Sequence, residues 1–319
     1  MELIIIKLFF LTLQYKLLNM MKEGSSKDKR KKHGDFSTFI NKKAKSKFAH
    51  KKKPPVSKEQ SKEVKKRQKK YSKTTYTKGG NGGLIRLNKY IADAGICSRR
   101  EADKLIDAGV IKVNGKIITL LGTKVSPSDK VQYGDQTITR EKTRYVLLNK
   151  PRGFITTTED PFERKTVMNL VRNACNERIY PVGRLDRNTT GLLLFTNNGE
   201  LAKKLTHPKH GVRKIYHVVL DKALSKKDIA TIAEGIELED GFIKVDAIAY
   251  AEGGKNKREV GIELHSGKNR IIKRLFESVG YNVLKLDRVV FAGLTKKDVP
   301  RGKWRHLKEK EVGFLKMIK

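Results

Sequence analysis

Residues 181–199 read PVGRLDRNTTGLLLFTNNG and place one acid, Asp186, in a short turn rich in Arg, Thr and Gly. The apolar run Leu192–Thr196 that follows is typical of a buried strand, and the Asn-Asn-Gly after it predicts a turn. Arg184 and Arg187 put positive charge on both sides of Asp186. A single Asp in a loop is most often a turn former or a helix cap. The local pattern by itself therefore favours a structural role.

The stretch resembles the catalytic signature of the rRNA pseudouridine synthases, in the RsuA/RluB family, which modify single uridines. In that family the Asp of GRLD is the essential catalytic residue, which implies this role for Asp186. The resemblance also implies a Tyr on a later strand and a basic residue on a later helix. Residues 213–220, RKIYHVVL, alternate as a strand does and carry Tyr216. Residues 267–276, GKNRIIKRLF, resemble the third motif and put Lys273 at the basic position.

Further matches extend the resemblance over most of the chain after about Ile85. Residues 148–153, LNKPRG, look like the opening Lys-Pro-x-Gly motif, and LDR and GKWR follow at residues 286–288 and 302–305. The nearest likeness is to the RluB-like branch, which acts on large-subunit rRNA. A small-subunit enzyme like RsuA is the alternative, and a non-catalytic RNA-binding ribosome-assembly factor is another. An intact Asp186, Tyr216 and Lys273 argue against the last.

The family's reaction explains these residue types. Conversion of uridine to pseudouridine breaks a C–N glycosidic bond and rejoins the same base through carbon, so the resemblance implies no cofactor. Asp186 can act as nucleophile or base. Tyr216 can stack on a base that has left its helix, although a strand Tyr is more often a core residue. Lys273 would hold Asp186 in place.

Basic side chains predict the substrate contacts. A helix over Asn269–Val279 would have one apolar stripe and one basic stripe, with Arg270 and Arg274 facing phosphates. The alternative is a solvated basic face. With the RNA-binding module described below, the predicted substrate-binding residues are Arg184, Arg187, Arg270, Arg274, Lys150, Arg99, Arg100 and Lys104.

Composition indicates a polyanionic partner. The 319 residues include 71 Lys or Arg against 34 Asp or Glu, a net charge of +37. Ribosomal RNA or a pre-ribosomal particle is the first candidate, and an anionic membrane surface the second. Two cysteines are too few for a disulfide framework and favour a cytoplasmic location. The close histidines His207 and His210 have no Cys or carboxylate beside them, so no metal site is predicted.

Residues 1–83 are predicted to be a disordered Lys-rich extension. Lys22–Lys78 contains 22 Lys or Arg against 5 Asp or Glu and few large apolar residues, and the glycines at residues 79–83 are typical of a linker. Residues 1–20 hold an apolar run that is interrupted by Lys7 and Lys16, which disfavours a membrane anchor. We expect translation to start at Met20 or Met21, which would make residues 1–20 a mis-assigned start.

Residues 84–143 are predicted to form a small separate domain. Helical spacing ends at Gly95, and Ser98 with Glu101 forms a capping box that opens a second helix. Asn114-Gly115 between two β-branched runs predicts a hairpin. The pattern resembles the alpha-L RNA-binding module, named after a ribosomal small-subunit protein. Residues 144–319 would then be an α+β catalytic domain built on a mixed, largely antiparallel sheet, and the protein is expected to act as a monomer.

Overall fold

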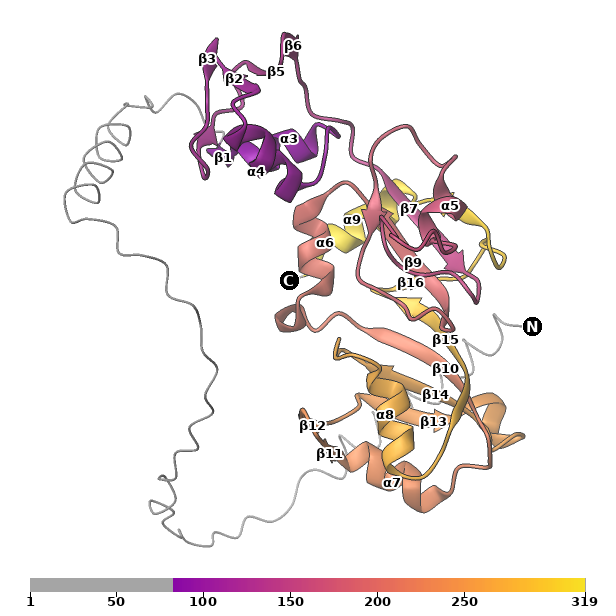
Figure 1. The fold of residues 1–319 in the computed structure, drawn as a ribbon. Coiled ribbons are helices and arrows are strands. Elements are labelled where there is room, and N and C mark those ends of the chain that lie inside the picture. The colour runs from indigo at the N-terminus through magenta and orange to yellow at the C-terminus, as the bar shows by residue number, and fades with distance from the viewer. Residues whose placement is uncertain (1–82, 319) are drawn as a thin grey trace, which may run out of the picture. The chain divides into compact units, whose positions relative to one another are not determined.

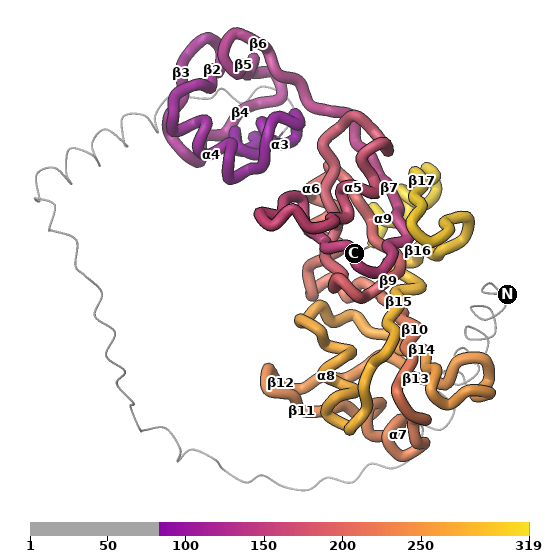
Figure 2. Tube along the Cα trace, turned by 45° about the vertical axis from the view of Figure 1, so that its right-hand side comes forward, coloured from indigo at the N-terminus to yellow at the C-terminus, as the bar shows by residue number. Residues whose placement is uncertain are grey.

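The computed structural model describes residues 83–318, most of whose helices and strands are labelled in Figure 1, and the chain can be traced in Figure 2. The first part holds two helices, α3 (Leu87–Asp93) and α4 (Arg99–Asp107). Two small sheets accompany them, with strand orders β1-β4 and β3-β2-β5-β6. The strands are β1 (Ile85–Arg86), β2 (Ile111–Val113), β3 (Lys116–Ile117), β4 (Lys124–Val125), β5 (Val131–Tyr133) and β6 (Gln136–Thr137).

Local signals determine this first part. Ser98 Oγ accepts a hydrogen bond from the Glu101 backbone N–H at 3.3 Å, and the Glu101 carboxylate accepts from the Ser98 N–H at 2.7 Å, so the predicted capping box is confirmed. Asn114 and Gly115 have φ values of 51° and 77° and make the tight turn between β2 and β3. The two helices contribute Leu87, Ala102 and other fully buried residues to one small core.

The second part is built on a nine-stranded sheet of order β13-β14-β10-β15-β9-β7-β17, with β16 beside β15 and β8 beside β9. Every pairing is antiparallel except that of β9 with β15, so the predicted mixed, largely antiparallel α+β fold is confirmed. β11 (Ile236–Leu238) and β12 (Gly241–Ile243) form a separate hairpin. The nine strands are β7 (Tyr145–Lys150), β8 (Tyr180–Pro181), β9 (Thr190–Thr196), β10 (Lys214–Leu220), β13 (Ala247–Tyr250), β14 (Glu259–Leu264), β15 (Val283–Phe291), β16 (Leu294–Thr295) and β17 (Trp304–His306).

Helices pack on two separate apolar cores of this part. α5 (Val167–Val171), α7 (Lys226–Glu234) and α8 (Ile271–Ser278) contribute to the larger core. α6 (Gly199–Thr206) and α9 (Glu309–Met317) contribute to the smaller one. Strand β9 sends Leu193 and Phe195 into the first core and Leu192 and Leu194 into the second. Because both faces of β9 are covered, its sequence is an unbroken apolar run without polar alternation.

The parallel pair β9–β15 depends on Gly191. The register sets Asp287 opposite Thr190 and Arg288 opposite Gly191. A Cβ atom at Gly191 would lie 2.3 Å from the backbone oxygen of Arg288, and the φ of Gly191 is +109°, which few other residues adopt. Glycine therefore lets β15 come against the start of β9, directly after the turn that holds Asp186.

Two predictions concern residues outside the range 83–318. The Lys-rich extension and the apolar run at residues 1–20 both lie outside the described range. Within residues 83–318, none of the helices has the length and apolar character needed to cross a bilayer. In the same range, no cluster of three or more His, Cys, Asp or Glu side chains is arranged to hold a metal ion.

Candidate active site

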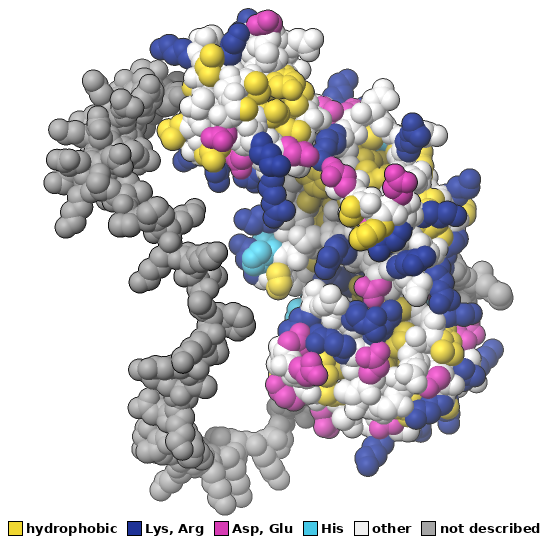
Figure 3. Space-filling view, in the orientation of Figure 1, with side chains coloured by type: hydrophobic (Ala, Val, Ile, Leu, Met, Phe, Trp, Pro, Cys, Tyr) yellow, Lys and Arg dark blue, Asp and Glu magenta, His cyan; other side chains and the backbone are white. Residues whose placement is uncertain are grey.

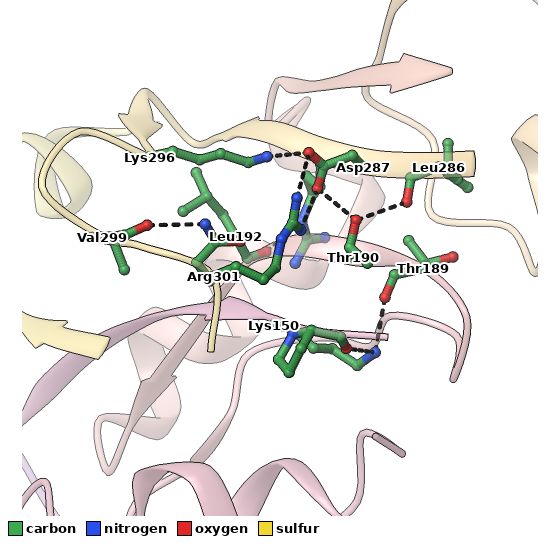
Figure 4. Close-up of polar contacts among 12 residues, drawn as sticks. Lys150, Thr189, Thr190, Leu192, Leu286, Asp287, Lys296, Val299 and Arg301 are labelled. Carbon is green, nitrogen blue, oxygen red and sulfur yellow. Dashed lines mark hydrogen bonds and ion pairs between the residues drawn. The ribbon is translucent and has the colours of Figure 1, made fainter. Parts of the chain in front are cut away.

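The turn that carries Asp186 is held from below by Lys150, the last residue of β7. Lys150 is 0% exposed, and its ammonium donates hydrogen bonds to backbone carbonyls. The acceptors are the oxygens of Pro151 (3.2 Å), Asp186 (3.1 Å), Arg187 (3.2 Å) and Thr189 (2.8 Å). Figure 4 shows Lys150 directed at Thr189. The prediction that Lys150 binds substrate is therefore wrong, because its amine is enclosed and already bonded to the turn.

Burial lowers the pKa of Lys150 to about 8, since the charged form loses its hydration, and the nearby charge of Asp186 opposes the shift. The carbonyl oxygens around Nζ replace part of the lost water. Lys150 thus fixes the backbone at Asp186 and at Arg187 and Thr189 after it, and it is not among the residues that line the cavity.

Asp186 and Lys273 meet although they are far apart in the chain. Asp186 Oδ2 lies 3.4 Å from Lys273 Nζ, and their side chains are 41% and 16% exposed. Lys273 stands on α8, whose apolar residues Ile272 and Phe276 are buried in the larger core. Packing of α8 therefore aims the lysine at the carboxylate.

A cavity of about 500 Å³ opens beside Asp186. Tyr216, 9% exposed on β10, lines it together with Asp186. Asp186 is the single acid among the lining residues, and six of the others are basic: Arg184, Arg187, Lys214, Lys268, Arg270 and Arg288. Figure 3 shows Lys and Arg side chains, in dark blue, gathered across the middle of the visible face. The site suits an anionic substrate that must reach one carboxylate.

The structure brings some predicted contacts to this cavity and leaves others away from it. Arg184, Arg187 and Arg270 line it. Arg274 does not, because its guanidinium is paired with Asp240 at 2.9 Å. Its contact with RNA phosphate stays a prediction without support from the geometry.

The helix predicted over Asn269–Val279 begins later than expected. α8 starts at Ile271, and Arg270 before it has a left-handed backbone with φ of 48°. Arg270 lines the cavity and also lies 3.5 Å from Glu277, whereas Lys273 and Arg274 pair with Asp186 and Asp240. The three basic residues of the first domain, Arg99, Arg100 and Lys104, lie exposed on α4.

Three basic lining residues were not predicted: Lys214, Lys268 and Arg288. Burial lowers the pKa of Lys214 to about 8, and the positive charge of Arg288 adds to the effect. The LDR match at residues 286–288 contained Arg288, but no local pattern assigned it a role. Only the pairing of β9 with β15 brings it to the cavity that Asp186 lines.

A second acid, Asp287, is fully engaged close to the site. It pairs with Lys296, accepts from Arg301 at 2.9 and 3.2 Å, and accepts from Thr190 Oγ1 at 2.7 Å. Figure 4 shows these three side chains converging on Asp287. Burial opposes its charge, but Arg301 and Lys296 outweigh burial and lower the pKa of Asp287 to about 2. This cluster joins β15 and the segment after β16 to the start of β9.

Comparison with known proteins agrees with this geometry. Residues 144–278 match the family model of the RNA pseudouridylate synthases, and residues 85–131 match the S4 domain. The chain is 41% identical over 237 residues to ribosomal large subunit pseudouridine synthase B of Bacillus subtilis, covering 74% of this chain and 97% of that protein. The chain belongs to the RNA pseudouridine synthases. The predicted family is confirmed, and the predicted alpha-L module corresponds to the S4 domain.

Other relatives of the synthase have similar coverage. The dual-specificity RNA pseudouridine synthase RluF of Escherichia coli is 37% identical, covering 73% of this chain and 79% of its own. A crystal structure of a pseudouridylate synthase is 28% identical, with a TM-score of 0.51, covering 72% of this chain and 99% of that one. The region between about Ile85 and the C-terminus is thus the part that the synthase shares with its family.

Proposed function

We propose that this synthase converts one specific uridine of large-subunit ribosomal RNA to pseudouridine, with Asp186 as the reacting group. The observation that carries the proposal is the position of Asp186, the single acid among the residues lining a basic cavity that Tyr216 also lines. The large-subunit assignment is supported by the name of the Bacillus subtilis relative. Lys273 would hold the carboxylate, and Tyr216 would stack on the base.

The charges of the cavity fit an RNA substrate. Arg184, Arg187 and Arg270 can contact phosphates around a uridine that has turned out of its helix, as enzymes acting on paired or stacked bases require. Arg99, Arg100 and Lys104 of the S4 domain would contact a second stretch of RNA backbone. The reaction itself conserves atoms: the bond from ribose C1′ to uracil N1 breaks, a bond from C1′ to C5 forms, C5 loses a proton and N1 gains one.

The test is to map pseudouridines in both rRNAs of a strain that lacks the gene and of the same strain with the gene restored. We expect one position of the large-subunit rRNA to lose its pseudouridine and to regain it with wild-type protein, but not with Asp186→Asn. Loss of a small-subunit position would assign the other subunit. Unchanged maps would contradict an enzymatic role in rRNA and favour an assembly factor.

We further propose that the synthase acts as a monomer in the cytoplasm. The location is supported by its two free cysteines, Cys97 and Cys175, which suit a reducing compartment, and the monomeric state is left to direct measurement. Light scattering of the purified protein during gel filtration measures the mass directly, and a dimer mass would contradict the proposal.

A further inference from the structure

Arg288 is a buried side chain with an unused donor. It is 3% exposed, its Nε donates to the Leu192 carbonyl at 2.8 Å, and its guanidinium lies over the Phe291 ring at 4.5 Å from the centroid. Its Nη2 is buried and has no hydrogen-bond partner among the described residues. A guanidinium has five N–H donors, and buried polar atoms are rarely left without an acceptor. An acceptor from outside the chain would complete this site.

Arg288 also belongs to the wall of the cavity. Arg288 lies on β15 directly opposite Tyr216 on β10, and residues opposite each other on neighbouring strands point to the same face. Both line the cavity with Asp186. The charge of Arg288 is felt there, since it contributes to lowering the pKa of Lys214, although burial of Lys214 is the larger cause. No carboxylate of the described residues forms an ion pair with Arg288.

The depth of Arg288 identifies the part of the RNA that it meets. A phosphate lies on the outside of the strand and suits the more exposed arginines, whereas a turned-out base enters furthest. Tyr216, the proposed stacking ring, is only 9% exposed, and Arg288 opposite it only 3%. The acceptors of uracil at this depth are its two carbonyl oxygens. When the bond from C1′ to N1 breaks, electron density left on the ring is shared with these oxygens.

We propose that Arg288 Nη2 donates a hydrogen bond to a carbonyl oxygen of the target uracil and retains the ring while it turns over. The inference rests on the proposed function. Arg288 keeps its own protons throughout, so it adds nothing to the balance of the reaction. A preorganised donor in a site that excludes water is effective at stabilising developing negative charge. Arg288 is thereby a substrate-binding residue, distinct from Asp186, which reacts.

The first test measures binding without reaction. In protein carrying Asp186→Asn, the affinity for the mapped rRNA fragment is compared with that for the same fragment lacking the target base. We expect Arg288→Met to reduce this preference for the base by about tenfold, the effect of losing one charge-assisted hydrogen bond. Affinity for the baseless fragment should stay unchanged. An unchanged preference in a protein that melts normally would overturn the proposal.

The matched control is Arg258→Met. Arg258 Nε also donates to a backbone carbonyl, that of Leu220 at 3.1 Å, but Arg258 does not line the cavity. This variant should keep the preference for the base. If it loses the preference equally, the effect of Arg288→Met is structural and the proposal fails.

The second test leaves the protein unchanged, which covers the case that Arg288→Met does not fold. Wild-type enzyme reacts with fragments in which sulfur, a weaker acceptor, replaces either O2 or O4 of the target uracil. We expect one of the two replacements to slow single-turnover formation of the product by about tenfold. If the two sulfur-containing fragments react at equal rates, the proposal is overturned.

The proposed function and the proposed role of Arg288 can be refuted independently of each other. Absence of pseudouridine formation by wild-type protein would refute the proposed function. The base preference of the unreactive Asp186→Asn protein decides the role of Arg288 whether or not the wild type reacts.

Discussion

Two aspartates near the crossing of β9 and β15 have opposite surroundings. Asp287 is 16% exposed and is bonded to Lys296, Arg301 and Thr190. Asp186 is 41% exposed and has one partner within ion-pair distance among the described residues, Lys273 at 3.4 Å. The same side chain therefore holds the sheet together in one place and is left open to a cavity in the other. The number of partners around a carboxylate, more than its distance from the site, distinguishes the two roles.

The largest expected effect is that of Asp186→Asn on catalysis. The change removes the charge but hardly alters shape, so pseudouridine formation should fall by at least about 10³-fold, or ~4 kcal/mol. Affinity for RNA and thermal stability should stay close to wild type because Asp186 is partly open. Single-turnover assays measure the rate, RNA titrations the affinity, and melting curves the thermal stability. Activity near the wild-type rate would remove Asp186 from the mechanism.

Gly191→Ala tests the backbone crossing between the two aspartates. The new Cβ would meet the Arg288 backbone at 2.3 Å, where no flexible side chain can yield. We expect a loss of about 3 kcal/mol or more in the free energy of unfolding, or no soluble protein. Gly153→Ala is the matched control, since Gly153 also has a positive φ, +92°, but nothing lies within 4 Å of its Cβ position. If urea unfolding shows the same loss of unfolding free energy for both variants, the positive φ explains the effect. The close approach of the Arg288 backbone then does not.

Asp287→Asn should reduce stability with little direct effect on the reacting group. The pKa of Asp287 is about 2 in the folded protein, below the unfolded value of about 3.9. Its contribution, about 2 kcal/mol, is therefore present above pH 4 and is lost as the pH falls from 4 toward 2. Urea unfolding should show a lower free energy of unfolding for the variant than for the wild type at pH 7. This difference should become smaller below pH 4.

Asp135→Asn serves as the control for this pH dependence. Asp135 is 97% exposed and pairs with Lys112 at the surface, where such pairs contribute little. The free energy of unfolding of Asp135→Asn should match that of the wild type at every pH. A gap for Asp287→Asn that stays constant down to pH 3 would show that its ion pairs are not the cause.

The smallest expected effect is that of Lys273→Met, which removes the one ion-pair partner that the Asp186 carboxylate has among the described residues. Turnover should fall by about tenfold, or ~1.4 kcal/mol, because the carboxylate loses its orientation. The affinity for RNA should change less than the turnover. Steady-state kinetics separate kcat from KM, and a change confined to KM would make Lys273 a phosphate contact.

The first domain could be derived almost entirely from sequence. Its capping box, its Asn-Gly turn and the Gly95 that follows α3 depend on neighbours a few residues away, and each was found where expected. β9 and β10 were also predicted within two residues of their observed limits, because apolar runs and alternation report burial directly.

The role of Lys150 could not be derived in this way. Its motif implied a substrate contact, but the lysine is the last residue of a buried strand and is enclosed by the turn that it supports. The sequence shows that residue 150 is a lysine, but it does not show whether the ammonium contacts the substrate or the backbone of the turn. The same holds for Arg274, because three strands, β12 to β14, separate it in the chain from its partner Asp240.

The sequence by itself determined the two-part order of the chain, its family and the identity of Asp186, Tyr216 and Lys273 as the candidate catalytic set, since these depend on short motifs and their order. Tertiary structure alone decided which basic residues share the cavity, that Lys150 supports the turn, and that Arg288 lines the cavity and keeps a buried donor without a partner among the described residues. The physical reason is that β15 pairs in parallel with β9 only where Gly191 admits its backbone, and such long-range contacts leave no periodic signal in either segment.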